Sequence, residues 1–245
     1  MVPLVCDHVI DGHVMYRHGP FRAPAAAGRG HDGERRAGDG PAYRRWGLDA
    51  PLAPAPPHGR PALGGGLPPV VDRVVTRDRV VFLTYDDAAE RDPRFVDMVR
   101  ELRLPVSVFL TDDVVGPGYG HFARLRAFGA SLQNHTLDHV ALRGLPYAGQ
   151  RAEICGQRDK LGARFGVRSR LFRPPYGLYD ATTLRAAADC GVSAVVLGRR
   201  PGVRAPRAGD ILIGGDDPDL AGALTRLLRQ VQEQGLTPAR LEDYL

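Results

Sequence analysis

The chain has 245 residues, of which 43% are hydrophobic and 25% charged, and its formal net charge is +5. This length allows one well-formed core, and the composition is that of a soluble globular protein. Arginine residues are scattered and only 7% of residues are aromatic, so the basic stripe and aromatic platforms of a nucleic-acid binder are missing. The sequence holds no run of about eighteen apolar residues, which excludes a membrane-spanning helix.

The first residues do not have the pattern of a signal peptide. They lack a basic segment, and Asp7, His8 and Asp11 interrupt any apolar stretch. A cytoplasmic location is therefore the default expectation. Secretion remains the alternative if the natural start of the protein differs from this one.

Three cysteines, Cys6, Cys155 and Cys190, occur without any CxxC pair, so a zinc–thiolate site is not favoured. Cys155 and Cys190 lie at helical positions with apolar neighbours, and buried free thiols are the default expectation for them. A bridge between these two cysteines remains an alternative for an exported protein.

Residues 1–68 differ in composition from the rest of the chain. Proline, glycine and alanine dominate the stretches 23–30, 51–57 and 64–66, and apolar residues recur there with no period. We therefore predict a flexible or loosely packed N-terminal arm over residues 1–68 and one folded domain over residues 69–245.

From residue 70 onward, strand-like and helix-like segments alternate. The predicted strands cover residues 80–84, 106–110, 130–133, 170–172, 192–197 and 211–213. The predicted helices cover residues 92–103, 118–128, 147–165, 180–190 and 218–234, with a short one near 238–245. Asp180 is expected to cap the fourth of these helices, and Gly191 to end it.

Repeated strand–helix units imply a parallel sheet, because parallel neighbours need crossover connections. About seven such units predict an α/β fold, namely an incomplete or distorted (β/α) barrel of about seven strands. A doubly wound open sheet is the alternative.

Three short stretches place polar groups just after predicted strands. The strand 80–84 leads to Asp86 and Asp87, the strand 130–133 leads to His135 and His139, and the strand 170–172 leads to Arg173. Because ligands and catalytic groups gather at the carboxyl edge of such sheets, we expect these side chains to lie together.

Asp87, His135 and His139 form a candidate metal-ligand set. On a helical turn, a spacing of four residues puts both imidazoles on one face, within reach of one divalent ion. One carboxylate and two imidazoles suit zinc or a similar ion and leave positions for water and substrate. Each stretch alone has an ordinary structural explanation as a turn, a cap or a surface pair. Their occurrence together, in this order, favours a metal site.

The motifs Thr84-Tyr-Asp-Asp87, His135-Thr-Leu-Asp-His139 and Arg173-Pro-Pro-Tyr-Gly177 resemble the first three motifs of the polysaccharide deacetylases. This family is also known as the NodB-homology domain or carbohydrate esterase family four. The resemblance runs from about Val70 to Leu245. It implies a divalent metal, with Zn²⁺ as the first choice and Co²⁺, Ni²⁺ or Mn²⁺ as alternatives.

The resemblance also implies roles for three further residues. Asp86 would be the general base that takes a proton from the metal-bound water, and Arg173 would orient Asp86 and keep it ionised. The backbone N–H of Tyr176 would help to bind the tetrahedral oxyanion.

The sequence departs from the family pattern at three places. Ala88 stands where a glycine usually follows the two aspartates, and residues 192–206 hold neither the acid nor the tryptophan of the fourth motif, so that Arg173 lacks its usual partner. Gly215 falls where the family carries the histidine that protonates the leaving group. Loss of such an acid lowers the rate by roughly two to four powers of ten. Asp216 could substitute if burial raised its pKa.

These observations predict a metal-dependent deacetylase that hydrolyses an acetamido or acetyl ester group on a carbohydrate. The expected partner is an N-acetylated oligosaccharide or polysaccharide, or a small acetylated substrate, and no nucleic acid. One alternative is a degenerate metal-binding relative that binds a glycan without turnover. Another is an enzyme that acts on a different C–N bond or carbonyl of a small metabolite. The oligomeric state is left open.

Overall fold

The computed structural model describes residues 40–59, 61, 65–87, 92–215 and 217–245. In this part of the chain, seven parallel strands form a curled half-barrel in the order β1-β6-β5-β4-β3-β2-β7, and β8 pairs with the start of β2. The strands are β1 (Val70–Val71), β2 (Val80–Asp86), β3 (Val106–Leu110), β4 (Ser131–Asn134), β5 (Leu171–Phe172), β6 (Ala194–Val196), β7 (Ile211–Gly214) and β8 (Thr237–Pro238). The incomplete barrel predicted from the sequence is confirmed, and the doubly wound alternative is not.

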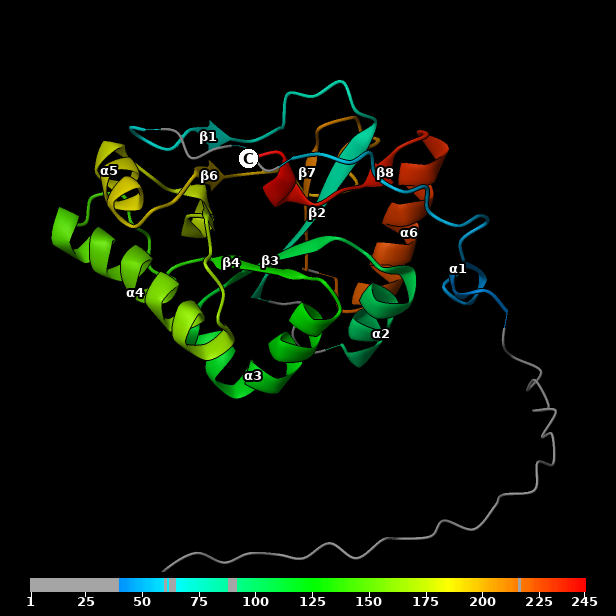
Figure 1. The fold of residues 1–245 in the computed structure, drawn as a ribbon, viewed down its shortest axis with the longest axis horizontal. Coiled ribbons are helices and arrows are strands. Elements are labelled where there is room, and N and C mark those ends of the chain that lie inside the picture. Colours follow the sequence, from blue (N-terminus) through cyan, green and yellow to red (C-terminus); the bar gives the residue numbers. More distant parts are fainter. Residues whose placement is uncertain (1–39, 60, 62–64, 88–91, 216) are drawn as a thin grey trace, which may run out of the picture. The chain divides into compact units, whose positions relative to one another are not determined.

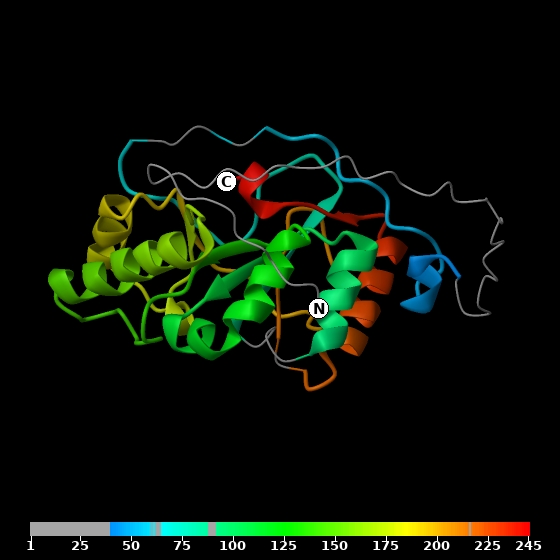
Figure 2. The same ribbon diagram turned by 60° about the horizontal axis from the view of Figure 1, so that its bottom comes forward.

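Five longer helices lie on the outer side of the curled sheet (Figure 1). They are α2 (Pro93–Leu102), α3 (Asp112–Ala127), α4 (Tyr147–Phe165), α5 (Ala181–Asp189) and α6 (Leu220–Glu233). Contacts between neighbours run from α5 through α4, α3 and α2 to α6, so the helices form one continuous layer (Figure 2). None of the helices in the described part of the chain is long and apolar enough to cross a membrane.

Two predicted helices begin at other residues in the structure. Helix α3 starts at Asp112, before the predicted residue 118, and continues through Pro117. Its acidic first turn, Asp112 and Asp113, suits the positive end of the helix dipole. Helix α6 starts at Leu220, because the side chain of Asp219 accepts a hydrogen bond from the backbone N–H of Gly222 and caps the helix there.

The end of the chain is less helical than predicted. The sequence suggests a short helix near residues 238–245, whereas the structure has strand β8 followed by a single 3₁₀ turn, η3 (Leu241–Asp243). Two more short elements complete the fold: α1 (Ala42–Arg45) and the 3₁₀ turn η2 (Pro175–Gly177).

The predicted ends of α5 are confirmed. Asp180 accepts a hydrogen bond from the backbone N–H of Thr183, and the Thr183 hydroxyl completes a capping box. The N–H of Gly144 also donates to the Asp180 carboxylate, and these bonds lower the pKa of Asp180 to about 2. Gly191 follows the helix with a φ of 73°, a conformation that glycine adopts at little cost.

The core is densest around β2. Every residue of this strand except Asp86 is buried, as expected for a parallel strand covered on both faces. Phe82 and Phe109 are fully buried together inside the curl, while Phe95 and Met98 fill the space between the sheet and α2. Each such side chain contributes about 1.5–3 kcal/mol when it leaves water.

A disulfide joins α4 to the end of α5. Cys155 and Cys190 are 35 residues apart in sequence, and their Cα atoms lie 5.0 Å apart. The default expectation of free thiols is therefore wrong for this pair. Helices α4 and α5 pack side by side, and this packing brings the two Cα atoms within the range that a disulfide requires.

Residues 40–59 belong to the predicted N-terminal arm, yet they contact the domain at many points. Leu48 is only 3% exposed, and the carbonyl groups of Gly47 and Ala50 accept hydrogen bonds from Arg229 and Gln232 of α6. The Thr237 hydroxyl donates to the carbonyl of Ala53. Residues 1–39 lie outside the described part, and the boundary at residue 68 stays a prediction.

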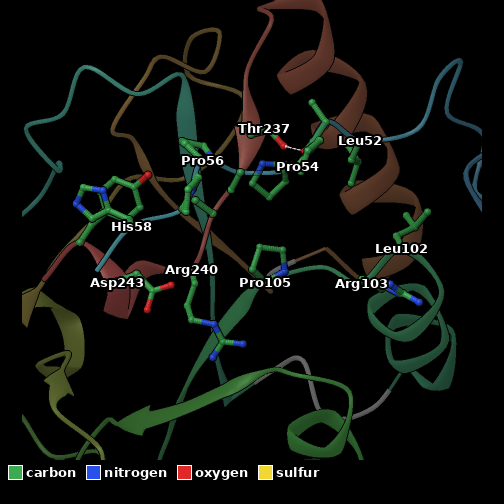
Figure 3. Close-up of a pocket in the computed structure, with 16 residues that line it drawn as sticks. Leu52, Pro54, Pro56, His58, Leu102, Arg103, Pro105, Thr237, Arg240 and Asp243 are labelled. Carbon is green, nitrogen blue, oxygen red and sulfur yellow. Dashed lines mark hydrogen bonds between the residues drawn. The ribbon is translucent and has the colours of Figure 1, made fainter. Parts of the chain in front are cut away.

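The proline-rich stretch 51–58 crosses the end of the half-barrel at which β2 begins. Figure 3 shows Pro54 beside Thr237, and the ring of His58 stacks on that of Tyr244 with the centroids 4.0 Å apart. A cavity of about 630 Å³ lies between this stretch, the end of α2 and the C-terminal residues.

Candidate metal centre and active site

The predicted site residues come from the carboxyl ends of neighbouring strands. Asp86 ends β2 and Asp87 follows it, His135 follows β4, and Arg173 follows β5. Because β2, β3, β4 and β5 are consecutive and parallel in the sheet, all of these ends lie at the same edge.

A cavity of about 580 Å³ opens at this edge. Its lining includes five of the six predicted site residues, namely Asp86, His135, His139, Arg173 and Tyr176. The sixth, Asp87, lies beside the two histidines. The structure thus brings together all six residues that the sequence singles out.

Asp87, His135 and His139 each offer one ligand atom, and these atoms lie within 4.8 Å of one another. The carboxylate of Asp87 is held by Thr111 at the end of β3. The Thr111 N–H donates to Oδ1 at 2.8 Å, and the Thr111 hydroxyl donates to Oδ2 at 2.8 Å. Thr111 therefore fixes the direction in which the carboxylate points.

The imidazole of His135 is buried and has a defined tautomer. Its Nδ1 lies 2.7 Å from the backbone carbonyl of Arg173. A carbonyl only accepts, so Nδ1 carries the hydrogen and Nε2 keeps its lone pair. Burial lowers the pKa of His135, which favours the neutral imidazole that binds metals.

The two histidines lie on a loop. The prediction of a helical turn between them is wrong. Residues 135–139 have no helical assignment, and both Thr136 and His139 have left-handed backbones, with φ of 75° and 53°. Such conformations cost about 1–3 kcal/mol each in residues other than glycine. The surrounding bonds must therefore hold the loop in shape.

Glu153 and Asn134 supply those bonds. Glu153, on α4, accepts hydrogen bonds from the N–H groups of Leu137 (3.1 Å) and Asp138 (3.0 Å). The side chain of Asn134 accepts one from the N–H of Thr136 at 2.9 Å. Burial raises the pKa of Glu153. Sequence patterns do not distinguish Glu153, because a charged residue on an amphipathic helix usually faces water.

Arg173 is 3% exposed, and all three nitrogens of its guanidinium donate hydrogen bonds. Nη1 donates to Oδ1 of Asp86 at 2.6 Å, and Nη2 donates to the hydroxyl of Thr84 at 2.9 Å. The backbone carbonyl of Leu197 lies 3.3 Å from Nη2, and the ring of Phe109 lies 4.1 Å below the guanidinium carbon. The carboxylate of Asp86, a hydroxyl, carbonyl groups and an aromatic ring thus surround the guanidinium of Arg173.

Tyr176 lies in η2, directly after two prolines. Its backbone is left-handed, with φ of 60° and ψ of 8°. Its hydroxyl lies 3.2 Å from Nδ1 of His139, although the residue as a whole is 68% exposed.

Gly215 follows β7, whose residue Ile213 lines the cavity. Its φ of 126° is a conformation that residues with a side chain rarely adopt. Among the described residues that line the cavity, the only imidazoles are those of His135 and His139. Asp216, the suggested substitute acid, lies outside the described residues.

The donor set fits a divalent cation. It comprises one carboxylate and two imidazoles. Thr111 fixes the carboxylate of Asp87, and the bond at Nδ1 fixes the ring of His135 and leaves its Nε2 for a metal. The fold and this cluster together define an α/β half-barrel with a candidate metal centre at the carboxyl edge of its sheet.

Comparison with known proteins gives the family. The model of the polysaccharide deacetylase family matches residues 73–195, which is half of the chain. The chain therefore belongs to the polysaccharide deacetylase family.

Individual relatives agree with this assignment. An uncharacterized protein of Streptomyces coelicolor is 58% identical, over 80% of this chain and 86% of the relative. A chitooligosaccharide deacetylase of Sinorhizobium fredii is 28% identical over 47% of this chain, and the match spans about half of that relative, 55%. The crystal structure of a family 4 carbohydrate esterase from Bacillus anthracis superposes with a TM-score of 0.64 at 21% identity, covering 71% of this chain and 86% of that one. This structural likeness shows the fold.

Proposed function

We propose that the protein is a metal-dependent deacetylase that hydrolyses an acetamido group on a carbohydrate. One observation carries the proposal: the Asp87–His135–His139 cluster shares a cavity with the Arg173–Asp86 ion pair. Family membership and the chitooligosaccharide deacetylase among the relatives support a carbohydrate substrate.

A divalent ion held by Asp87, His135 and His139 would supply a Lewis acid and lower the pKa of water. Asp86 is the base in this proposal. Arg173 occupies Oδ1 of Asp86 and leaves Oδ2 to accept a proton from the attacking water. The backbone N–H of Tyr176 donates to the carbonyl oxygen of the substrate as negative charge develops on it.

Cleavage of the C–N bond requires a proton on the leaving nitrogen. The described cavity offers no imidazole beyond the two in the ligand cluster. We therefore assign this step to Asp86, which gives the nitrogen the proton that it took from water. The hydroxide part of the water stays on the acetyl carbon, and the products are acetate and a free amino sugar.

The test measures acetate release from N-acetylglucosamine oligomers by zinc- or cobalt-loaded protein, together with the metal content of two variants. Asp87→Ala should lose both metal and activity, because one of three ligands is gone. Asp86→Asn has nearly the same shape and should keep its metal but lose activity by about 10²–10⁴-fold. Loss of metal from Asp86→Asn instead would reverse the roles of the two carboxylates.

A glycan-binding protein without turnover is the second candidate, and Gly215 is the observation that favours it. Replacing this glycine by histidine would not simply restore an acid, because a side chain is strained at a φ of 126°. A metal-loaded wild type that binds N-acetylglucosamine oligomers but releases no acetate would establish this candidate.

A further inference from the structure

Tyr176 and His139 contact each other in two ways. The Tyr176 hydroxyl lies 3.2 Å from Nδ1 of His139, and the two rings meet edge to face, with centroids 4.9 Å apart and planes at 76°. The residues come from different loops, one after β4 and the other after β5. The contact therefore joins the histidine loop to the Arg-Pro-Pro-Tyr turn.

The two histidines of the cluster are held with different strength. His135 is buried, and a backbone carbonyl fixes its Nδ1 at 2.7 Å. His139 is less buried, and within the described part of the chain the hydroxyl of Tyr176 is the hydrogen-bond partner that its ring has. Removing that hydroxyl takes away this hydrogen-bond partner, which sets the tautomer of the His139 ring and helps to set its rotation.

Both residues have left-handed backbones, with φ of 60° at Tyr176 and 53° at His139. Each conformation costs about 1–3 kcal/mol in a residue with a side chain, so surrounding contacts must maintain it. The edge-to-face packing of the two rings, which does not need the hydroxyl, is one such contact. It lies at the surface, where little else holds Tyr176.

We propose that the Tyr176 hydroxyl is a positioning group for the metal centre, and this inference rests on the proposed function of that centre. With a metal at Nε2 of His139, Nδ1 carries the hydrogen and donates it to the Tyr176 oxygen. The hydroxyl thereby holds the ring with Nε2 directed at the ion. Tyr176 thus serves the site twice, through its backbone N–H toward substrate and through its hydroxyl toward a metal ligand.

The test is the zinc affinity of Tyr176→Phe, measured by competition with a fluorescent zinc chelator. This variant keeps the ring and loses only the hydroxyl. We expect zinc binding about 10- to 100-fold weaker than in the wild type. The visible absorption bands of the cobalt-loaded variant should also change, because the His139 ring is no longer fixed. The matched control is Tyr179→Phe, which removes a nearby hydroxyl that does not contact His139.

The melting temperature of the metal-free protein separates positioning from a general structural effect. It should be equal in the wild type and Tyr176→Phe, because the exposed hydroxyl supports no core. Unchanged zinc affinity and cobalt spectrum in Tyr176→Phe would overturn the inference and leave the proposed function intact. A wild type that binds zinc no better than Asp87→Ala would instead overturn the metal centre, and the inference with it.

Discussion

Thr111 shows how a single residue can determine the direction of a candidate metal ligand. It donates both its N–H and its hydroxyl to Asp87. Thr111→Val keeps the shape and the backbone donor and removes one bond. We expect zinc affinity to fall about 10-fold, as is usual when a partner of a metal ligand is lost. The competition titration described for Tyr176 measures this change.

Thr225→Val is the matched control, since the Thr225 hydroxyl donates to the carbonyl of Ala221 within α6, far along the chain from the candidate ligands. Helix α3 should persist in Thr111→Val, because Thr111 precedes that helix without capping it through its side chain. Equal affinity of Thr111→Val and wild type would show that the backbone N–H alone orients Asp87.

Sequence reasoning at the residue scale identified Asp87 and His135 because each follows a predicted strand, and His139 because it lies four residues after His135. It missed Thr111 and Glu153. Thr111 bonds to a residue 24 positions away, and Glu153 bonds to residues 15 and 16 positions away. Hydrogen bonds between residues so far apart in the sequence depend on how strands and helices pack. No local sequence pattern at Thr111 or Glu153 indicates its role.

Among the elements, α5 should have a stability that depends on pH through its cap. The pKa of Asp180 is about 2 in the folded protein, below its ordinary value of 3.8. A lowered pKa stabilises the fold above the unfolded value, and this contribution is lost as pH falls from about 5 to 2. We expect the free energy of unfolding of the wild type to exceed that of Asp180→Asn by about 0.3–1 kcal/mol at pH 7. Asparagine caps the helix as well as aspartate but lacks the charge, and solvent screens the effect of that charge at this partly exposed position.

Urea unfolding of both proteins at pH 7, 5 and 3 measures this difference. The gap between the two free energies of unfolding should be constant from pH 7 to 5 and should shrink at pH 3. A gap that is the same at all three pH values would show that the charge of Asp180 does not contribute to the stability.

The elements that sequence reasoning placed well have clear end signals. Helix α4 covers residues 147–165 as predicted, because Pro146 precedes it and Gly166 follows it in a left-handed conformation. The start of α3 was missed because Gly116, Pro117 and Gly118 resemble a break, yet all three lie inside the helix. Local propensity is a weak guide where tertiary packing holds a helix in place.

For the whole molecule, the position of the domain boundary determines what a truncated chain retains. A chain that begins at residue 40 keeps Trp46 and Leu48 and serves as the reference. In a chain that begins at residue 69, the free energy of unfolding should be lower by about 2–5 kcal/mol, because Leu48 and the partly buried Trp46 no longer cover the core. Thermal and urea unfolding of the two truncated chains measures this. Equal stability of both would place the boundary at residue 68, as the composition suggests.

The parallel half-barrel could be predicted because alternating strand and helix periods leave few topologies. The contacts of residues 40–59 with the domain could not be predicted from the sequence. Proline excludes the regular hydrogen bonding of helices and sheets, and the stretch 51–58 indeed forms neither. Composition does not say whether such a segment packs. Here Trp46 donates to Glu101 of α2, and Leu48 is buried in the main core.

The disulfide between Cys155 and Cys190 is a covalent link between α4 and the end of α5, and its presence depends on redox conditions. Thiols stay oxidised in oxidising surroundings and are kept reduced by glutathione and thioredoxin in the cytosol. Helix α4 also carries Glu153, which holds the turn between His135 and His139. Oxidation or reduction at Cys155 thus acts two residues away from Glu153, which supports the candidate metal centre. Protein made under reducing conditions would lack the disulfide at that place.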